Sequence, residues 1–154
     1  MIPAILIHGP TASGKTALAI EVARRLGGEV INADSMQVYR DLQVISARPT
    51  EEEMGGVKHH LFGHVDAAER YSTGQWLEDV RATIRNLELR GKRAVLVGGT
   101  GLYLLAMIQG LSNIPPVPEE VRADVRAIAD AEGAEGLRAR LAPVDPETAD
   151  RLGT

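Results

Sequence analysis

Cysteine is absent from the 154-residue sequence, and aromatic residues make up only 3% of it. A chain without cysteine has no disulfide framework and no thiolate metal site, and the cytosol is its natural compartment. No apolar stretch approaches the roughly eighteen residues needed to cross a membrane, and the N-terminus lacks an export signal. These absences predict a cytoplasmic protein without a membrane partner.

An excess of positive charge is missing as well, since 17 Lys and Arg residues stand against 21 Asp and Glu residues. Residues 1–110 carry 12 basic and 12 acidic side chains, whereas residues 111–154 carry 5 and 9. This balance counts mildly against nucleic-acid binding through overall charge, although a local basic groove is compatible with it. The hydrophobic fraction of 44% is ordinary for a soluble globular domain.

The clearest positive feature is the phosphate-loop pattern G-x-x-x-x-G-K-[ST] at residues 9–16, between an apolar run and a helical pattern. Its glycines allow backbone N–H groups to converge on a phosphate, and the following helix adds free N–H groups and its dipole. The alternative is a glycine turn that only joins strand to helix. Lys15 would meet the outer phosphates, and the Thr16 hydroxyl would bind Mg²⁺. The predicted diphosphate site is Gly9, Pro10, Thr11, Ala12, Ser13, Gly14, Lys15 and Thr16.

Short apolar runs alternate with helical patterns as far as residue 110. We expect strands at residues 4–7, 29–33, 59–65 and 93–97, helices at residues 14–26, 72–91 and 102–109, and a surface loop with a helical turn at residues 41–58. Ser72 and Gln75 have the spacing of a capping box. The alternation predicts an α/β fold, a P-loop NTPase-like parallel sheet with helices on both faces.

The character of the chain changes after residue 110, where prolines at positions 115, 116 and 118 cannot continue a helix. We expect a helix at residues 119–132, a short one near residues 137–141 and another from residue 145, with an inner stripe on the first of Val121, Val125, Ile128 and Ala129. We therefore divide the chain into a P-loop α/β core at residues 1–110 and the start of a helical insertion at residues 111–154. Such a sheet usually has more strands, so we expect the core to be incomplete.

Asp34 is the carboxylate of most interest because it follows the second expected strand, at the sheet edge where open α/β folds bind ligands. An aspartate there can cap a helix, bind magnesium or act as a general base. Ser35 and Gln37 have side chains suited to reading the edge of a base, although polar loop residues are common. The turn at residues 98–101 is either a second anion-facing loop or a point of close packing.

Histidines and arginines elsewhere allow other interpretations. His59, His60 and His64 lack the spacing of a closed metal site, so surface or core positions are favoured over metal binding. Arg122 and Arg126 lie four residues apart on one expected helical face, where they could pair with carboxylates or contact RNA phosphates.

Three motifs in register resemble those of the tRNA dimethylallyltransferase family, also called tRNA isopentenyltransferases. They are residues 9–16, Asn32-Ala33-Asp34-Ser35-Met36-Gln37-Val38-Tyr39 and Gly98-Gly99-Thr100-Gly101-Leu102-Tyr103-Leu104. Residues 145–149 resemble the family's inserted helical region. The resemblance implies transfer of a dimethylallyl group from dimethylallyl diphosphate to N6 of adenosine 37 of tRNA. This adenosine adjoins the 3′ side of the anticodon in tRNAs that read codons beginning with U.

The same resemblance implies roles for individual residues. Asp34 matches the family's catalytic aspartate, while Lys15 and a magnesium ion held by Thr16 would stabilise the departing diphosphate. Contacts with the tRNA are implied for Asp34, Ser35, Met36, Gln37, Thr100 and Arg122. We expect a monomer. Family members run to about twice this length, so we expect the 154-residue chain by itself to bind tRNA weakly and to turn over poorly or not at all.

The sequence is also compatible with three other functions. An adenylate isopentenyltransferase shares the fold and the donor but modifies free AMP, and the helical segment after residue 111 favours tRNA only modestly. A P-loop small-molecule kinase would transfer a phosphoryl group from ATP, yet the arginine-rich lid of such kinases is not evident. A non-catalytic nucleotide-binding module would bind nucleotide equally well after Asp34→Ala.

Overall fold

The computed structural model describes residues 4–112, 115 and 117–152 of the chain. By its internal packing the chain divides into two compact units, Met1–Leu111 and Ser112–Thr154. Each unit is described by itself.

The first unit is built on a four-stranded sheet in the order β1-β4-β2-β3, and all neighbouring strands are parallel. The strands are short: β1 is Ile5–His8, β2 is Glu29–Asn32, β3 is His59–His60 and β4 is Ala94–Gly98. β2 and β4 have a partner strand on each side, and every residue in them is buried. The predicted P-loop NTPase-like α/β fold is confirmed.

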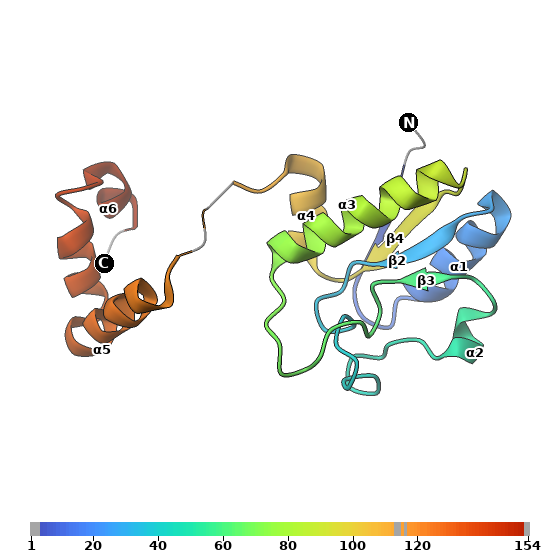
Figure 1. Cartoon of the computed structure of the whole chain (residues 1–154), viewed down its shortest axis with the longest axis horizontal. Coiled ribbons are helices and arrows are strands. Elements are labelled where there is room, and N and C mark those ends of the chain that lie inside the picture. The colour runs from blue at the N-terminus through green and yellow to red at the C-terminus, as the bar shows by residue number, and fades with distance from the viewer. Residues whose placement is uncertain (1–3, 113–114, 116, 153–154) are drawn as a thin grey trace. The chain divides into compact units, whose positions relative to one another are not determined.

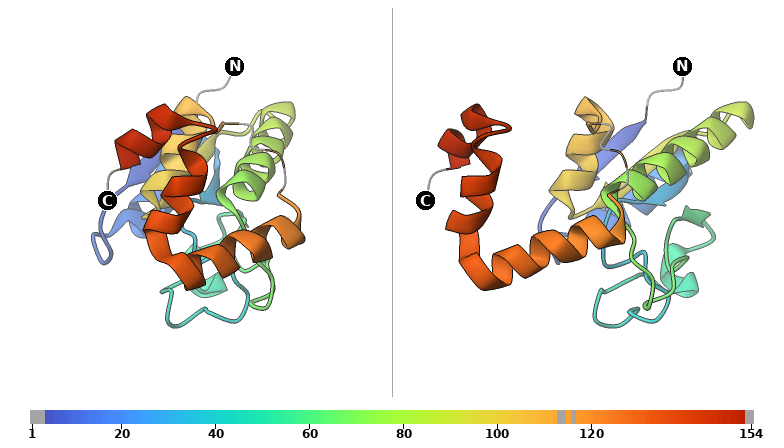
Figure 2. Two further views of the ribbon diagram at one scale, coloured as in Figure 1. Left: turned by 90° about the vertical axis from the view of Figure 1, so that its left-hand side faces the viewer. Right: turned by 60° about the vertical axis from the view of Figure 1, so that its left-hand side comes forward.

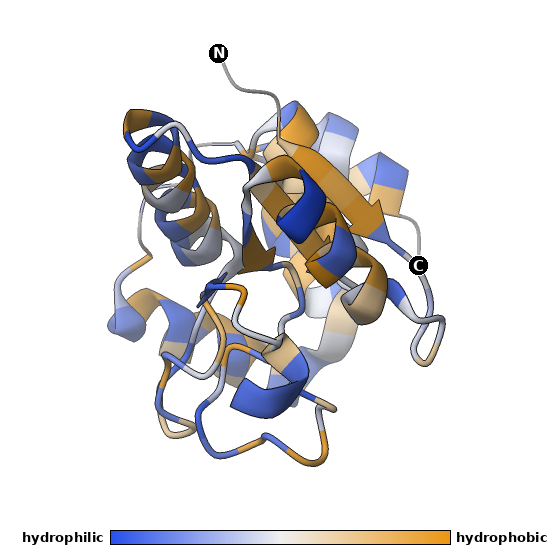
Figure 3. Ribbon diagram, turned by 90° about the vertical axis from the view of Figure 1, so that its right-hand side faces the viewer, coloured by the Kyte–Doolittle hydropathy of each residue, from blue (hydrophilic) through white to orange (hydrophobic). Residues whose placement is uncertain are grey.

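Helices cover both faces of this sheet, with α1 on one side and α3 and α4 on the other (Figure 1). Their bounds are Lys15–Leu26 for α1, Thr73–Leu89 for α3 and Gly101–Gln109 for α4. Val30 and Val95 enter the core under α1, whereas Ile31 and Leu96 enter the core under α3 and α4. Successive residues of a strand therefore pack into cores on opposite faces of the sheet, because side chains alternate between the two faces. Figure 3 shows that the strands of the sheet are mostly hydrophobic, whereas helices around it carry hydrophobic and hydrophilic residues.

The helix boundaries follow local signals in the sequence. α3 begins at the predicted capping box, in which Ser72 Oγ accepts from Gln75 N (3.2 Å) and Gln75 Oε1 accepts from Ser72 N (2.8 Å). These two bonds satisfy two N–H groups that a helix start leaves unpaired. α1 ends where Gly27 adopts a left-handed φ of 61°. The helical turn expected within residues 41–58 is α2, Glu51–Met54.

The strand expected at residues 59–65 is wrong beyond its first two residues. β3 pairs with β2 only at His59 and His60. Leu61 and Gly63 then take positive φ angles of 62° and 57°, which turn the chain out of the sheet. Val65 then forms an isolated parallel bridge with Tyr39, outside the four strands of the sheet.

The second unit contains α5 (Glu119–Leu141) and α6 (Pro146–Leu152). α5 bends at Gly133, where φ is 65° and ψ is −161°, one residue after the helix end expected at residue 132 (Figure 2). Val121 and Val125 are 44% and 47% exposed, so the expected inner stripe is wrong at these two positions. Residues 113, 114 and 116, part of the expected proline break, lie outside the described residues.

Across the described ranges, no helix combines the length and the apolar character that crossing a bilayer requires.

Candidate functional site

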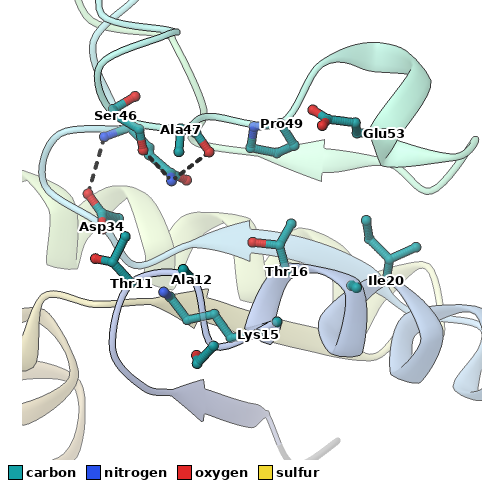
Figure 4. Close-up of a pocket in the computed structure, with 14 residues that line it drawn as sticks. Thr11, Ala12, Lys15, Thr16, Ile20, Asp34, Ser46, Ala47, Pro49 and Glu53 are labelled. Atoms are coloured by element: carbon teal, nitrogen blue, oxygen red, sulfur yellow. Dashed lines mark hydrogen bonds between the residues drawn. The ribbon is translucent and has the colours of Figure 1, made fainter.

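A cavity of about 550 Å³ lies between the phosphate loop and the segment that carries residues 46–49 (Figure 4). It stands beyond the carboxyl ends of β1 and β2, where open α/β sheets bind their ligands. The residues that line it are Thr11, Ala12, Ser13, Gly14, Lys15, Thr16, Ala17, Ile20, Asp34, Gln37, Ser46, Ala47, Pro49 and Glu53. The structure therefore brings Asp34 to the same cavity as most of the predicted phosphate loop.

The phosphate loop turns through Ala12 and Gly14, whose φ angles are 62° and 79°. Gly14 is also the N-cap residue of α1, and no side chain caps this helix. The first N–H groups of α1 are thus left without a capping side chain at the wall of the cavity. A helix start of this kind attracts an anion through its free N–H groups and its dipole.

Lys15 and Thr16 supply the side chains of this part of the cavity. Lys15 Nζ donates to the Pro10 carbonyl at 3.0 Å, so the side chain folds back over the loop. The Thr16 hydroxyl makes no hydrogen bond with any residue in the described part of the chain, and Thr16 projects from α1 toward the cavity (Figure 4). A cation and a free hydroxyl are therefore available beside the helix start.

Asp34 is half-buried, and its two carboxylate oxygens have different surroundings. Oδ1 accepts from the N–H groups of Met36 (2.9 Å) and Gln37 (3.4 Å). Oδ2 accepts no hydrogen bond from the residues that the structure describes. A Cβ atom at position 99 would lie 3.4 Å from Oδ2, so Gly99 keeps this side of the carboxylate open. One oxygen orients the side chain, and the other is free for a ligand.

The loop after β2 is fastened to the turn after β4 by Thr100. Ser35 N donates to Thr100 Oγ1 at 2.8 Å, and Thr100 Oγ1 donates to Ser35 Oγ at 3.2 Å. A Cβ atom on Gly98 would collide with the Ala33 carbonyl group, so only glycine permits this approach. This contact favours close packing as the reason for Gly98, and Thr100 links two of the three motifs.

Gln37 connects Asp34 to the opposite wall of the cavity. Its Nε2 donates to the carbonyl oxygens of Ser46 (2.9 Å) and Ala47 (3.3 Å), both of which line the cavity (Figure 4). Ala47 has a positive φ of 52°, which an alanine adopts at a cost unless its surroundings hold it there. The sequence carried no signal for this wall, because the two partners are nine and ten residues from Gln37.

A buried amide beside Asp34 belongs to a residue for which the sequence predicted no structural role. Asn32 has no exposed surface, and its side chain bonds to the main chain of Asp34 through both polar atoms. Trp76 Nε1 donates to the Asn32 carbonyl at 2.9 Å. A signal was present in the sequence, because a polar residue among the apolar residues of a buried strand must have partners.

The two other residues with a predicted tRNA contact are Met36 and Arg122. Met36 is 48% exposed beside Asp34. Arg122 lies on α5 in the second unit, where its Nε donates to the Val117 carbonyl at 3.3 Å. Its neighbour Arg126 forms an ion pair with Glu119 at 3.2 Å. This pair agrees with the expected alternative in which Arg126 pairs with a carboxylate.

The histidines have protein partners away from the cavity. His60 Nε2 lies 2.6 Å from Glu29 Oε2, and Arg90 contacts both oxygens of the same carboxylate. These hydrogen bonds, led by that of Arg90, lower the pKa of Glu29 to about 2. His59 contacts the Val57 carbonyl at 2.7 Å, and burial lowers its pKa.

The cavity offers few protein ligands for a magnesium ion. The described residues contain no group of three or more His, Asp or Glu side chains placed to hold a metal. Mg²⁺ usually keeps several waters and is bound through one or two protein oxygens together with substrate phosphates. The unengaged Thr16 hydroxyl at the start of α1 suits an ion of this kind, which a diphosphate would largely hold.

Proteins with similar sequences share a common name. A tRNA dimethylallyltransferase from Hyphomonas neptunium (strain ATCC 15444) is 75% identical over 154 residues, which are 100% of this chain and 49% of that protein. Another from Rhizobium etli (strain CIAT 652) is 59% identical over 143 residues, 93% of this chain and 48% of that protein. The chain spans about half the length of the curated relatives it matches.

Solved structures of proteins with equivalent names also match this chain. The full-length tRNA isopentenylpyrophosphate transferase of Bacillus halodurans matches with a TM-score of 0.72 and 38% identity, over 98% of this chain and 50% of that one. A eukaryotic dimethylallyltransferase acting on tRNA matches with a TM-score of 0.80 and 31% identity, over 96% of this chain and 37% of that one. The family model named IPP transferase matches residues 37–154, so the chain belongs to the IPP transferase family.

Proposed function

We propose that a protein containing this chain transfers the dimethylallyl group of dimethylallyl diphosphate to N6 of adenosine 37 in tRNA, with diphosphate as the second product. The observation that carries the proposal is that Asp34 and the phosphate loop line one cavity of about 550 Å³. A base and an anion site in one cavity suit a reaction that removes a proton and releases a diphosphate. The names of the relatives supply the group transferred and its acceptor.

Asp34 would act as the general base. The N6 amine of adenine is a poor nucleophile because its lone pair is delocalised into the ring. As N6 bonds to the allylic carbon, the carbon–oxygen bond breaks, its electron pair leaves with the diphosphate, and the N6 proton passes to Asp34. The oxygen available for that proton is Oδ2, because Oδ1 already accepts two main-chain N–H groups. A positioned base of this kind contributes typically about 10²–10⁴-fold to the rate.

The phosphate loop would stabilise the leaving group. Main-chain N–H groups of residues 11–16 would bind the diphosphate, and Lys15 would exchange the Pro10 carbonyl for a phosphate oxygen. Donors that are already in place cost little reorganisation when the negative charge develops. Thr16 would hold a magnesium ion, which neutralises part of the diphosphate charge when bound.

Adenosine 37 must leave its base stack to reach Asp34. We assign the tRNA contacts to Ser35, Met36, Gln37 and Thr100 beside Asp34 in the first unit, and to Arg122 in the second. The first unit would serve as the catalytic core and the second as the start of a helical tRNA-binding insertion. We also propose that this protein is a monomer and is located in the cytoplasm.

The test is a transfer assay with labelled dimethylallyl diphosphate and unmodified tRNA. It uses the full-length protein, meaning a protein of the relatives' length that contains this chain. We expect label on adenosine 37, identified by mass analysis of the nucleosides, and no label on AMP. Label on AMP alone would indicate an adenylate isopentenyltransferase, and phosphoryl transfer from ATP would indicate a kinase. Absence of transfer to tRNA would refute the proposal.

A further inference from the structure

Asn32 is a polar side chain with 0% exposure at the end of β2, two residues before Asp34. Burial of an amide is unfavourable unless its polar atoms form hydrogen bonds. The partners of this amide therefore indicate why a polar residue stands in an otherwise apolar part of the sheet.

Both polar atoms of the Asn32 side chain bond to the main chain of Asp34. Oδ1 accepts from Asp34 N at 2.9 Å, and Nδ2 donates to Asp34 O at 2.9 Å and to Leu61 O at 3.0 Å. The amide thus holds the peptide groups on both sides of the Asp34 Cα atom. Since φ and ψ at Asp34 lie between these two groups, the amide limits how far the residue can rotate.

Asn32 is itself held by the helices that cover this face of the sheet. Trp76 of α3, also 0% exposed, donates Nε1–H to the Asn32 carbonyl at 2.9 Å. The indole stacks on Tyr103 of α4, with ring centroids 4.3 Å apart and an angle of 15° between the planes. A close-packed core transmits displacement, so residue 32 cannot move without disturbing both helices.

We propose that Asn32, held by Trp76, is a positioning residue that fixes the main chain at Asp34 and thereby directs Oδ2 of Asp34 toward the substrate. The inference rests on the proposed function, in which Oδ2 accepts the N6 proton. Proton transfer requires the base to lie about 2.6–3.2 Å from the group that it deprotonates. A displacement of about 1 Å can cost 10²-fold in rate, so a small rotation at Asp34 matters.

Two substitutions weaken this network without removing Asp34. Trp76→Phe deletes the indole N–H and keeps an aromatic ring beside Tyr103. Asn32→Asp keeps the size of the side chain and an acceptor for Asp34 N, but removes the donor to Asp34 O and to Leu61 O. Val80→Ala is the matched control, because it also shortens a fully buried side chain of α3 but alters no hydrogen-bonding group.

The variants are compared in the full-length protein by kcat, by KM for dimethylallyl diphosphate and by thermal unfolding. We expect Trp76→Phe and Asn32→Asp to lower kcat about tenfold or more. KM for the donor should stay within about twofold, because the phosphate loop is unchanged. Val80→Ala should lower the unfolding temperature but leave kcat per folded molecule at the wild-type value. In an Asp34→Asn background, Trp76→Phe should cause no further loss, since no base is left to position.

An unchanged kcat in folded Trp76→Phe protein would overturn the inference, as would an equal loss of kcat in Val80→Ala or a further loss in the Asp34→Asn background. If Asn32→Asp does not fold, Trp76→Phe decides. Absence of transfer by the wild-type protein would instead overturn the proposed function, and this inference with it.

Discussion

The two carboxylate oxygens of Asp34 differ, because one is held by hydrogen bonds and the other is free to contact a ligand. Oδ1 is occupied by the main-chain N–H groups of Met36 and Gln37, and Oδ2 has no partner among the described residues. Oδ1 accepts from N–H groups of a turn at residues 35–38, where no helix begins, so the helix-cap interpretation is wrong. Oδ2 is the oxygen that the proposed general base would use. Holding the side chain and accepting a proton are compatible because they use different atoms.

Asp34→Asn should abolish most of the transfer while the donor still binds. An asparagine keeps the acceptor oxygen for the Met36 and Gln37 N–H groups but cannot take up the N6 proton. We expect kcat to fall by about 10²–10⁴-fold, measured by single-turnover transfer to tRNA. The dissociation constant of dimethylallyl diphosphate, measured by calorimetry, should change by less than about twofold.

Glu53→Gln is the matched control for this substitution, because Glu53 is a second carboxylate at the cavity. Glutamine retains the acceptor that bonds to Thr50 N in the capping box of α2. Transfer should therefore be close to that of the wild type. A similar loss in both variants would mean that negative charge in the cavity, rather than a base at position 34, is what the reaction needs.

At the scale of elements, the segment of residues 46–49 forms the wall of the cavity that faces the phosphate loop. Gln37 reaches this wall through two hydrogen bonds to main-chain carbonyls. Arg48 strengthens the same loop by donating to the Arg40 carbonyl at 2.9 Å. The shape of the cavity therefore depends on bonds between loops as well as on the phosphate loop.

Gln37→Ala should loosen this wall and weaken donor binding. Each of its two neutral hydrogen bonds contributes about 1 kcal/mol. If about half of that total is lost from donor binding, KM for dimethylallyl diphosphate should rise about three- to tenfold. Limited proteolysis within residues 42–48 should become faster. Gln43→Ala, on the same loop, is the control, because the Gln43 side chain bonds to no described residue. A rise in KM for tRNA alone would mean that the Gln37 side chain acts only through its proposed tRNA contact and does not support the wall.

A second element-scale contact joins the start of β2 to the end of α3. Arg90 donates to both oxygens of Glu29, at 2.7 and 2.9 Å, and His60 contacts the same carboxylate. The Arg90 bonds, aided by His60 and opposed by burial, lower the pKa of Glu29 from 4.5 to about 2. A carboxyl group with a lower pKa in the folded state stabilises the fold above its unfolded pKa. That stabilisation is lost as the pH falls from 4.5 toward 2.

Arg90→Met should therefore destabilise the protein at neutral pH and much less in acid. We expect the free energy of unfolding at pH 7 to fall, because the two bonds from Arg90 to the Glu29 carboxylate are lost. The difference from the wild type should shrink as the pH is lowered below 4.5. Urea unfolding at several pH values measures it, with Arg85→Met as a control at an exposed arginine of the same helix. A difference independent of pH would contradict this account.

At the scale of the whole molecule, the chain consists of two units and matches about half the length of its relatives. The phosphate loop, Asp34, Asn32 and Gln37 all lie in the first unit, whereas Arg122 lies in the second. Donor binding and tRNA binding are thus expected to depend on different lengths of chain.

The 154-residue chain alone should bind the donor but transfer it poorly to tRNA. We expect kcat/KM for tRNA to be at least about tenfold below that of the full-length protein, a difference of 1.4 kcal/mol or more. Donor affinity should be similar in the two, because the proposed diphosphate site lies in the first unit. Equal turnover by both proteins would contradict the prediction, and filter binding of tRNA would locate the defect.

The sequence by itself determined the elements whose interactions are local. The phosphate loop, the Ser72–Gln75 capping box and the glycine end of α1 depend on groups within about four residues, so a pattern in the chain identifies them. The alternation of elements determined the parallel sheet in the same way.

Only the tertiary structure decided which distant groups meet. It ended β3 after His60, joined Gln37 to Ser46, and held Asn32 with Trp76 across 44 positions of the chain. Such contacts depend on how helices pack on the sheet and on φ angles such as that of Leu61, and spacing in the sequence encodes neither. The phosphate-loop motif can therefore be recognised in the sequence, whereas the support of Asp34 exists only once the cores on both faces of the sheet have formed.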